Sequence, residues 1–160
     1  MYIPFEEMPP SARVWIYQAD RQLSEQEVNI IKSSSEAFLD QWAAHGSPLK
    51  SSFALYHDKF LVISVDESYN MASGCSIDAS VALVRNLEEK LGLGFFDRTK
   101  VAFLLNDEIF QSNMNDLKAL ISEGKISSDT ITFNNLVDNI DKFRNGWKVP
   151  ASETWLKRYF

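Results

Sequence analysis

The amino-acid sequence predicts an α+β fold of the ferredoxin-like type, in which a split β-α-β-β-α-β order forms one antiparallel sheet. Three observations support this prediction. Segments rich in β-branched and aromatic residues alternate with segments whose apolar residues have helical spacing. A two-residue link separates the second and third strands, as in a tight hairpin. The order strand, helix, strand, strand, helix, strand is complete by residue 106.

The chain divides into three parts on this prediction. Residues 1–12, which include three prolines, form an irregular lead-in. Residues 13–106 form the ferredoxin-like domain. Residues 107–160 form a helical extension that packs on the sheet or on a second subunit.

The first half of the domain begins with a strand at Arg13–Gln18, which is rich in β-branched and aromatic residues. Ser24 and Glu27 then have the spacing of a capping box, in which each side chain accepts a hydrogen bond from the other residue's amide. The helix that follows carries one apolar stripe. We expect it to end at Gly46, because glycine is the preferred residue after a helix.

The second half contains a hairpin, a helix and the fourth strand. The hairpin joins Phe53–His57 to Phe60–Val65, the helix runs from Ser76 to Leu91, and the last strand is Val101–Leu105. The extension then reads as helices at 116–123 and 133–144, the latter capped by Thr132, with a final turn or two at 152–159.

Both faces of the predicted strands are apolar, whereas helices cover only one face of a ferredoxin-like sheet. A free face of this kind exceeds what monomers usually expose. Either the extension or a second copy of the chain, in a homodimer, must cover it. The helical spacing of five apolar side chains favours the extension; they are Phe133, Leu136, Val137, Ile140 and Phe143.

Composition narrows the class of protein. The 160 residues, 45% of them hydrophobic, suffice for a core without a metal or disulfide staple. The single cysteine indicates a cytoplasmic location, and the first residues lack the pattern of a secretory signal. No apolar run could span a membrane. The net charge of −6 argues against nucleic acid as a partner.

Nucleotide hydrolysis lacks its sequence signature. The strand that ends in Asp66 and Glu67 imitates an element that holds magnesium in nucleotide hydrolases. That element works only beside a glycine-rich loop of the form G-x-x-x-x-G-K-[ST], which holds the phosphates. Gly124 and Lys125 are followed by Ile126, and Ala119 stands where the first glycine belongs. The sequence therefore argues against a P-loop ATPase.

Three stretches resemble a known family: Val14–Arg21, Trp42–Gly46 and Gly74–Asp78. They are similar to a family of short bacterial proteins without an assigned activity, some of which carry the name "ABC transporter ATPase". The resemblance covers most of the chain and implies no catalytic residue.

Connectivity predicts where a site could form. In the ferredoxin-like sheet, the link from the first helix to the second strand lies at the same end as the link from the third strand to the second helix. Cys75 lies at a helix N-terminus, where amide dipoles can stabilise a thiolate, and His45 could act as its base. Asp78 in the first turn opposes this, and a lone cysteine can also be a small buried apolar residue.

The same end supplies candidate ligand-binding residues. They are Arg13, Asp66, Glu67, Gly74, Ser76 and Asp78. Gly74 and Ser76 also suit a turn and a helix cap. The acids that end strands three and four could converge on a magnesium ion; they are Asp66, Glu67, Asp107 and Glu108. Acids that end a strand in water are more common. We expect neither a bound metal nor a cofactor.

Two functions follow from these observations. The first is a non-enzymatic cytoplasmic module that binds a partner protein or a small ligand, because no catalytic signature is present and both sheet faces are apolar. The alternative is a thiol-dependent enzyme or redox sensor that uses Cys75 with His45.

Overall fold

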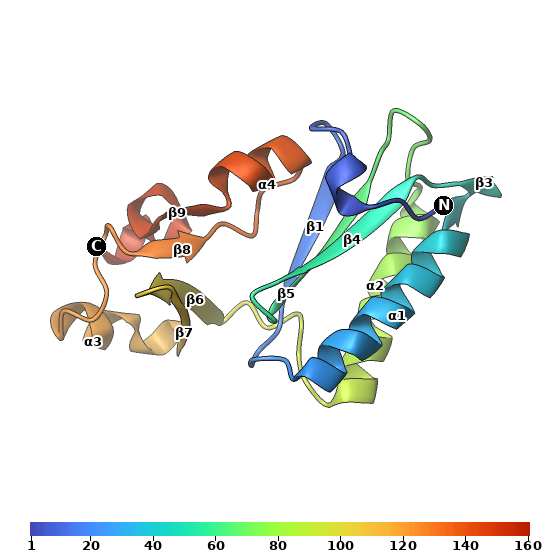
Figure 1. The fold of residues 1–160 in the computed structure, drawn as a ribbon. Coiled ribbons are helices and arrows are strands. Elements are labelled where there is room, and N and C mark those ends of the chain that lie inside the picture. Colours follow the sequence, from blue (N-terminus) through green and yellow to red (C-terminus); the bar gives the residue numbers. More distant parts are fainter.

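The structure, a computed structural model, describes residues 1–160 and confirms the α+β class. A three-stranded antiparallel sheet has the order β1-β5-β4, and two long helices cover one of its faces (Figure 1). These elements are β1 (Arg13–Gln18), β4 (Ser51–Tyr56), β5 (Phe60–Val65), α1 (Glu25–Gln41) and α2 (Gly74–Leu91).

A second sheet lies beside the first (Figure 1). It has four antiparallel strands in the order β7-β6-β8-β9. Two short helices and several 3-10 turns accompany it. The elements are β6 (Lys100–Leu105), β7 (Glu108–Asn113), α3 (Leu117–Ser122), β8 (Ile131–Phe133), α4 (Ile140–Gly146) and β9 (Lys148–Pro150), with 3-10 turns at Met114–Asp116, Ala151–Glu153 and Trp155–Tyr159.

The predicted four-stranded ferredoxin-like sheet is wrong in its fourth strand. Strands one, three and two have the expected order, but the fourth, β6, does not pair with β1. A strand has only two edges, and those of β6 are occupied by β7 and β8. The β6–β7 hairpin forms because Asn106 and Asp107 adopt positive φ angles of 51° and 64°, which suits a two-residue turn between antiparallel strands.

The prediction of a helical extension over residues 107–160 is also wrong in large part. The expected helix at 116–123 corresponds to α3, but the expected helix at 133–144 exists only as α4. Thr132 belongs to β8, where its hydroxyl donates to the Ala102 carbonyl at 2.7 Å. The true N-cap is Asn139, whose side chain accepts from the Lys142 amide. Residues 107–160 therefore form strands as well as helices.

The chain itself covers the second face of the three-stranded sheet. Phe133, Val137, Ile140, Phe143 and Trp147 share one buried cluster with residues of β1 and β5. Leu136, expected in the same stripe, is instead 73% exposed, because residues 134–137 form a turn. This cover removes the reason for which the sequence suggested a second copy.

Two further boundaries differ from the prediction. α1 ends at Gln41, and Gly46 belongs to a small hairpin between β2 (Ala43–Ala44) and β3 (Ser47–Pro48). His45 and Gly46, with φ angles of 50° and 80°, form its turn. No helix in the structure is long and apolar enough to cross a membrane.

Candidate functional site

The end of the three-stranded sheet where we expected a site does gather several of the predicted elements. The β2–β3 hairpin, the loop from β5 to α2 and the start of β1 lie at this end (Figure 1). The Asn70 side-chain amide donates to the carbonyls of Ser47 and Pro48, which ties the loop to the hairpin. We call this end of the molecule the rim.

The acids of the rim are engaged by their own loop. The Asp66 carboxylate accepts hydrogen bonds from the amide and hydroxyl of Ser68 at 3.1 and 2.6 Å. Glu67 accepts from the Ala72 amide and lies 3.6 Å from the Arg13 guanidinium. The structure therefore brings Arg13 and Glu67 together. The carboxylates of Asp66 and Glu67, however, hydrogen-bond within their own loop and stabilise its conformation.

The helix start at the rim is built by a capping box. The Ser73 hydroxyl accepts from the Ser76 amide, and the Ser76 hydroxyl accepts from the Ser73 amide. Ser76 is buried, and its carbonyl accepts from the Trp42 indole at 2.8 Å. Gly74 opens the helix in a conformation with no crowding at its Cα, and Asp78 is exposed. Ser76 thus serves the helix rather than an open site.

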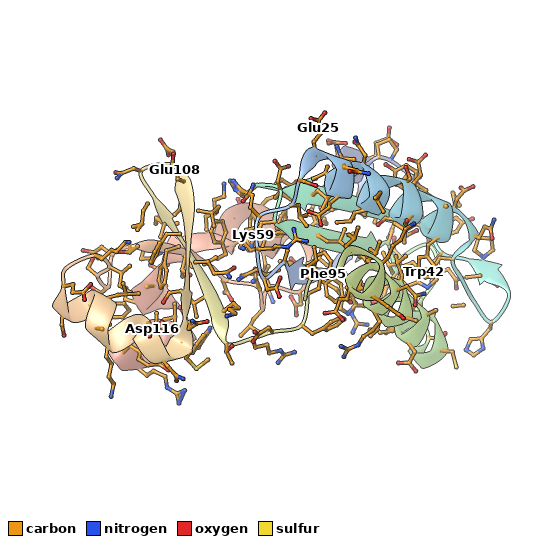
Figure 2. The ribbon with its side chains drawn as sticks, turned by 90° about the horizontal axis from the view of Figure 1, so that it is seen from below. Glu25, Trp42, Lys59, Phe95, Glu108 and Asp116 are labelled. Atoms are coloured by element: carbon orange, nitrogen blue, oxygen red, sulfur yellow. The ribbon has the colours of Figure 1, made fainter.

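Cys75 and His45 are both exposed, so the reading of Cys75 as a buried apolar residue is wrong. No hydrogen bond or ion pair joins the two side chains. Asp107 and Glu108, considered as partners of the rim acids, belong to the β6–β7 hairpin. Figure 2 shows Glu108 at the opposite end of the molecule from Trp42. No group of three or more His, Cys, Asp or Glu side chains is arranged to hold a metal ion.

A cleft that the sequence did not indicate lies between the two sheets. It has a volume of about 730 Å³, and residues from all of β1 line one side. The other side comes from β6, β8, the turn after β8 and the C-terminal 3-10 turn. We call it the intersheet cleft.

The lining of the intersheet cleft is mainly apolar, because 15 of its 25 residues are hydrophobic. Trp15, Ile16 and Phe96 are half-buried there. Two of the few exposed large apolar side chains in the molecule also line it: Leu136 is 73% exposed and Trp155 is 41% exposed. A volume of this size with an apolar lining is typical of a ligand site.

A polar network crosses one side of the cleft. The Gln18 amide nitrogen donates to the Lys100 carbonyl at 3.2 Å, and its oxygen accepts from the Asn135 amide at 3.1 Å. The Asn135 oxygen in turn accepts from the Trp147 indole at 2.9 Å. This network joins the two sheets through side chains and leaves the main chain of β1 facing the cleft. Sequence reasoning missed the cleft because β6 was placed there as a paired strand.

The glycine–lysine pair considered for phosphate binding lies after a helix. Gly124 follows α3 with a φ angle of 74°, and its amide donates to the Ile121 carbonyl. A phosphate loop instead precedes a helix, whose free amides face the phosphates. Comparisons with protein-family models, with curated proteins and with solved structures found no match to this chain.

Proposed function

We propose that this protein is a non-enzymatic binding module whose ligand occupies the intersheet cleft. One observation carries the proposal: two sheets of one chain leave between them a cleft of about 730 Å³ with a mainly apolar lining. Pockets that bind ligands combine an apolar lining with a few polar groups that set orientation. Gln18 and Asn135 supply such groups here, because each side-chain NH2 has a second hydrogen beyond the one used in the polar network.

The polar side chains of the cleft favour binding over catalysis. The hydroxyls of Thr132 and Thr154 both donate to backbone carbonyls, so neither is held next to a general base. Nucleophilic catalysis needs a nucleophile within hydrogen-bonding reach of such a base. The Asp138 carboxylate is paired with Lys142 at 3.0 Å. These groups shape and stabilise the cleft.

The exposed apolar residues at the cleft support the same proposal. When a ligand covers an exposed apolar side chain, the binding free energy becomes more favourable by about 25 cal/mol for each Å² of apolar surface removed from water. Leu136 and Trp155 are placed to make this contribution.

Titration of the ¹⁵N-labelled chain with a metabolite and peptide collection, followed by NMR, tests the proposal. Ligands should shift the signals of Trp15 and Trp155, and Leu136→Asp or Trp155→Ala should weaken binding about tenfold. The chain offers matched controls outside the cleft, because Met71 is 69% exposed and Phe160 is 41% exposed. Met71→Asp and Phe160→Ala should leave affinity unchanged. Equal losses in both pairs, or ligands that shift only the rim, would contradict the proposal.

A further inference from the structure

The outer edge of β1 has unpaired main-chain groups in the intersheet cleft. β1 pairs with β5 on one side only. On the other side, the Val14 amide donates to the Asp138 carbonyl at 3.0 Å, and the Asp20 amide donates to the Gly94 carbonyl at 2.9 Å. Main-chain groups alternate along a strand, so the even-numbered residues of β1 face away from β5. The amide and carbonyl of Ile16 and the amide of Gln18 face the cleft and meet no partner within the chain.

The opposite edge of the same sheet, on β4, is covered at Ser51 alone. The amide of Ser51 donates to the Met1 carbonyl at 3.0 Å, and the Ser51 carbonyl accepts from the Ile3 amide at 2.9 Å, whereas the amides and carbonyls of Phe53 and Leu55 face away from β5 and meet no partner within the chain. The β1 edge differs because it opens into the intersheet cleft. An open edge is a template for another strand, and proteins cover or interrupt edges for that reason. The β1 edge is covered at both ends, by Asp138 and by Gly94, and is open only in the middle. The open part of the β1 edge thus lies between two existing main-chain hydrogen bonds, one at Val14 and one at Asp20.

We infer that the ligand of the intersheet cleft is an extended peptide segment that pairs with β1 as an added strand. This inference rests on the proposed function and names its ligand class. The amides of Ile16 and Gln18 lie two residues apart, or roughly 6.6–6.8 Å along a strand. An extended backbone repeats its carbonyls at the same spacing, whereas a compact metabolite does not.

The cleft also specifies the side chains of this segment. A strand beside β1 would direct alternate side chains toward the two faces of the sheet. Phe96 lines the cleft on the face covered by the helices, and Val137 lines it on the other face. Both faces are therefore apolar, and the segment should carry apolar, β-branched or aromatic residues at successive positions.

Charge adds one further requirement. Acids outnumber basic residues by 22 to 16 in the whole chain, but the cleft is lined by three basic residues and two acids. Both acids are engaged: Asp97 accepts from the amide and hydroxyl of Thr99, and Asp138 pairs with Lys142. Arg98 has no acidic partner within 4.0 Å. It lies two residues before Lys100, whose carbonyl accepts from Gln18 and whose own ammonium donates to the Asn113 side-chain oxygen. The segment should therefore place an acidic residue at the Gln18 end of the edge.

Selection of phage-displayed heptapeptides on the full chain, followed by synthesis of the recovered peptides with capped ends, tests the inference. Binding should slow hydrogen exchange at the amides of Ile16 and Gln18 at least tenfold. Methylation of alternate peptide amides should weaken binding at least tenfold when the methylated amides face β1, and little when they face away. Unchanged exchange at these two amides, or equal binding of all methylated peptides, would overturn the inference.

Protein variants give a second arm. Ile16→Pro removes an amide that has no partner within the chain, so it should abolish peptide binding while Ile16→Val retains it. If Ile16→Pro unfolds the protein, the methylated peptides decide. Replacing the peptide's acidic residue by lysine should weaken binding about tenfold, and equal affinity would overturn the charge requirement. If the NMR titration finds metabolites that bind in the cleft but the selection recovers no peptide, the added strand is rejected and the proposed function is kept. If neither experiment finds a ligand, both are rejected.

Discussion

The two faces of the three-stranded sheet are buried by different means. On one face, α1 and α2 run for 17 and 18 residues, and each begins with a complete capping box. On the other face, the N-terminal lead-in contributes Phe5 and Met8 to the cover. The segment between Phe133 and Trp147, which comprises a strand end, a turn and one short helix, supplies the rest. Both faces exclude water from the same strands. The first face is recognisable from helical spacing, whereas on the second face the helical spacing that begins at Phe133 spans a turn and so does not correspond to one helix.

Aromatic contacts dominate the second face. The ring of Phe60 lies 4.6 Å from that of Phe133 and 4.9 Å from that of Trp147, measured between centroids. Trp147 also lies 4.8 Å from Phe143. Aromatic pairs at these distances stabilise a fold by about 0.5–1.5 kcal/mol beyond the burial of their area. A few large side chains can therefore replace a long helix as the cover of a sheet.

The largest expected effects come from two neighbours on β5 that separate the two faces. Phe60 and Leu61 are both fully buried, and they belong to the aromatic and the helix-covered clusters respectively. Phe60→Ala should lower the free energy of unfolding by about 3–5 kcal/mol, and Leu61→Ala by about 2–5 kcal/mol. Urea denaturation measures both losses.

Hydrogen exchange then separates the two variants. Phe60→Ala should increase exchange mainly in β8 and α4, and Leu61→Ala mainly in α1 and α2. If both variants accelerate exchange in the same elements, the two faces are not independent in the way their packing indicates.

The next effect concerns Lys59 in the turn between β4 and β5. This residue is only 2% exposed, and burial lowers the pKa of its ammonium group from 10.5 to about 8, although the Asp20 carboxylate opposes the shift. Figure 2 shows Lys59 in the middle of the molecule. Below pH 8 the folded state carries the whole cost of a buried charge. Lys59→Met should therefore raise the free energy of unfolding at pH 7, by at most about 3 kcal/mol.

The pH dependence of stability checks the cause of this gain. Because the folded state loses its proton at a lower pH than the unfolded state, stability should rise as the pH increases from 8 toward 10.5. Tyrosine ionisation affects stability above about pH 10, so the slope is best measured between about pH 8 and 9.5. The slope should be present in the original protein and reduced in Lys59→Met. An equal slope in both proteins would assign it to other groups.

A smaller effect is expected from the helix cap on the first face. The Ser24 hydroxyl accepts from the Glu27 amide, and Glu27 accepts from the Ser24 amide. Ser24→Ala should lower the free energy of unfolding by about 1 kcal/mol. Ser33→Ala, on the exposed side of α1, is the matched control and should not destabilise the protein. Equal losses in the two variants would show that the cap contributes little.

The smallest effect is expected at Cys75. Its side chain is exposed and makes no hydrogen bond, so Cys75→Ser should change the free energy of unfolding by less than about 0.5 kcal/mol. The folded protein should also react completely with iodoacetamide, and the serine variant should not react. A protected thiol, or a large loss of stability, would show that Cys75 is packed in solution.

Much of the helix-covered half could be predicted from the sequence. The bounds of β1 and β5 match the prediction, and the second helix differs by two residues at its start. Capping boxes and β-branched runs are local signals, so they survive without knowledge of the tertiary structure. The predicted end of α1 was wrong because Gly46 suits a hairpin turn as well as a helix terminus.

The other half depends on signals that the helical pattern concealed. Phe133, Val137 and Ile140 have helical spacing, but Asn134 and Asn135 form a turn between a strand and a helix. Asparagine pairs favour turns, and this signal could have divided the segment. The intersheet cleft could not be predicted, because it exists only when β6 leaves β1 for another sheet.

Gln18 gives this arrangement a mechanical consequence. Its side-chain nitrogen donates to the Lys100 carbonyl in β6, and its side-chain oxygen accepts from Asn135 after β8. Hydrogen bonds are directional, so they resist displacement that apolar packing would tolerate. A displacement of β1 along the sheet would therefore also strain the hydrogen bonds to β6 and to the turn after β8. Gln18 in this way couples the position of the three-stranded sheet to that of the four-stranded sheet.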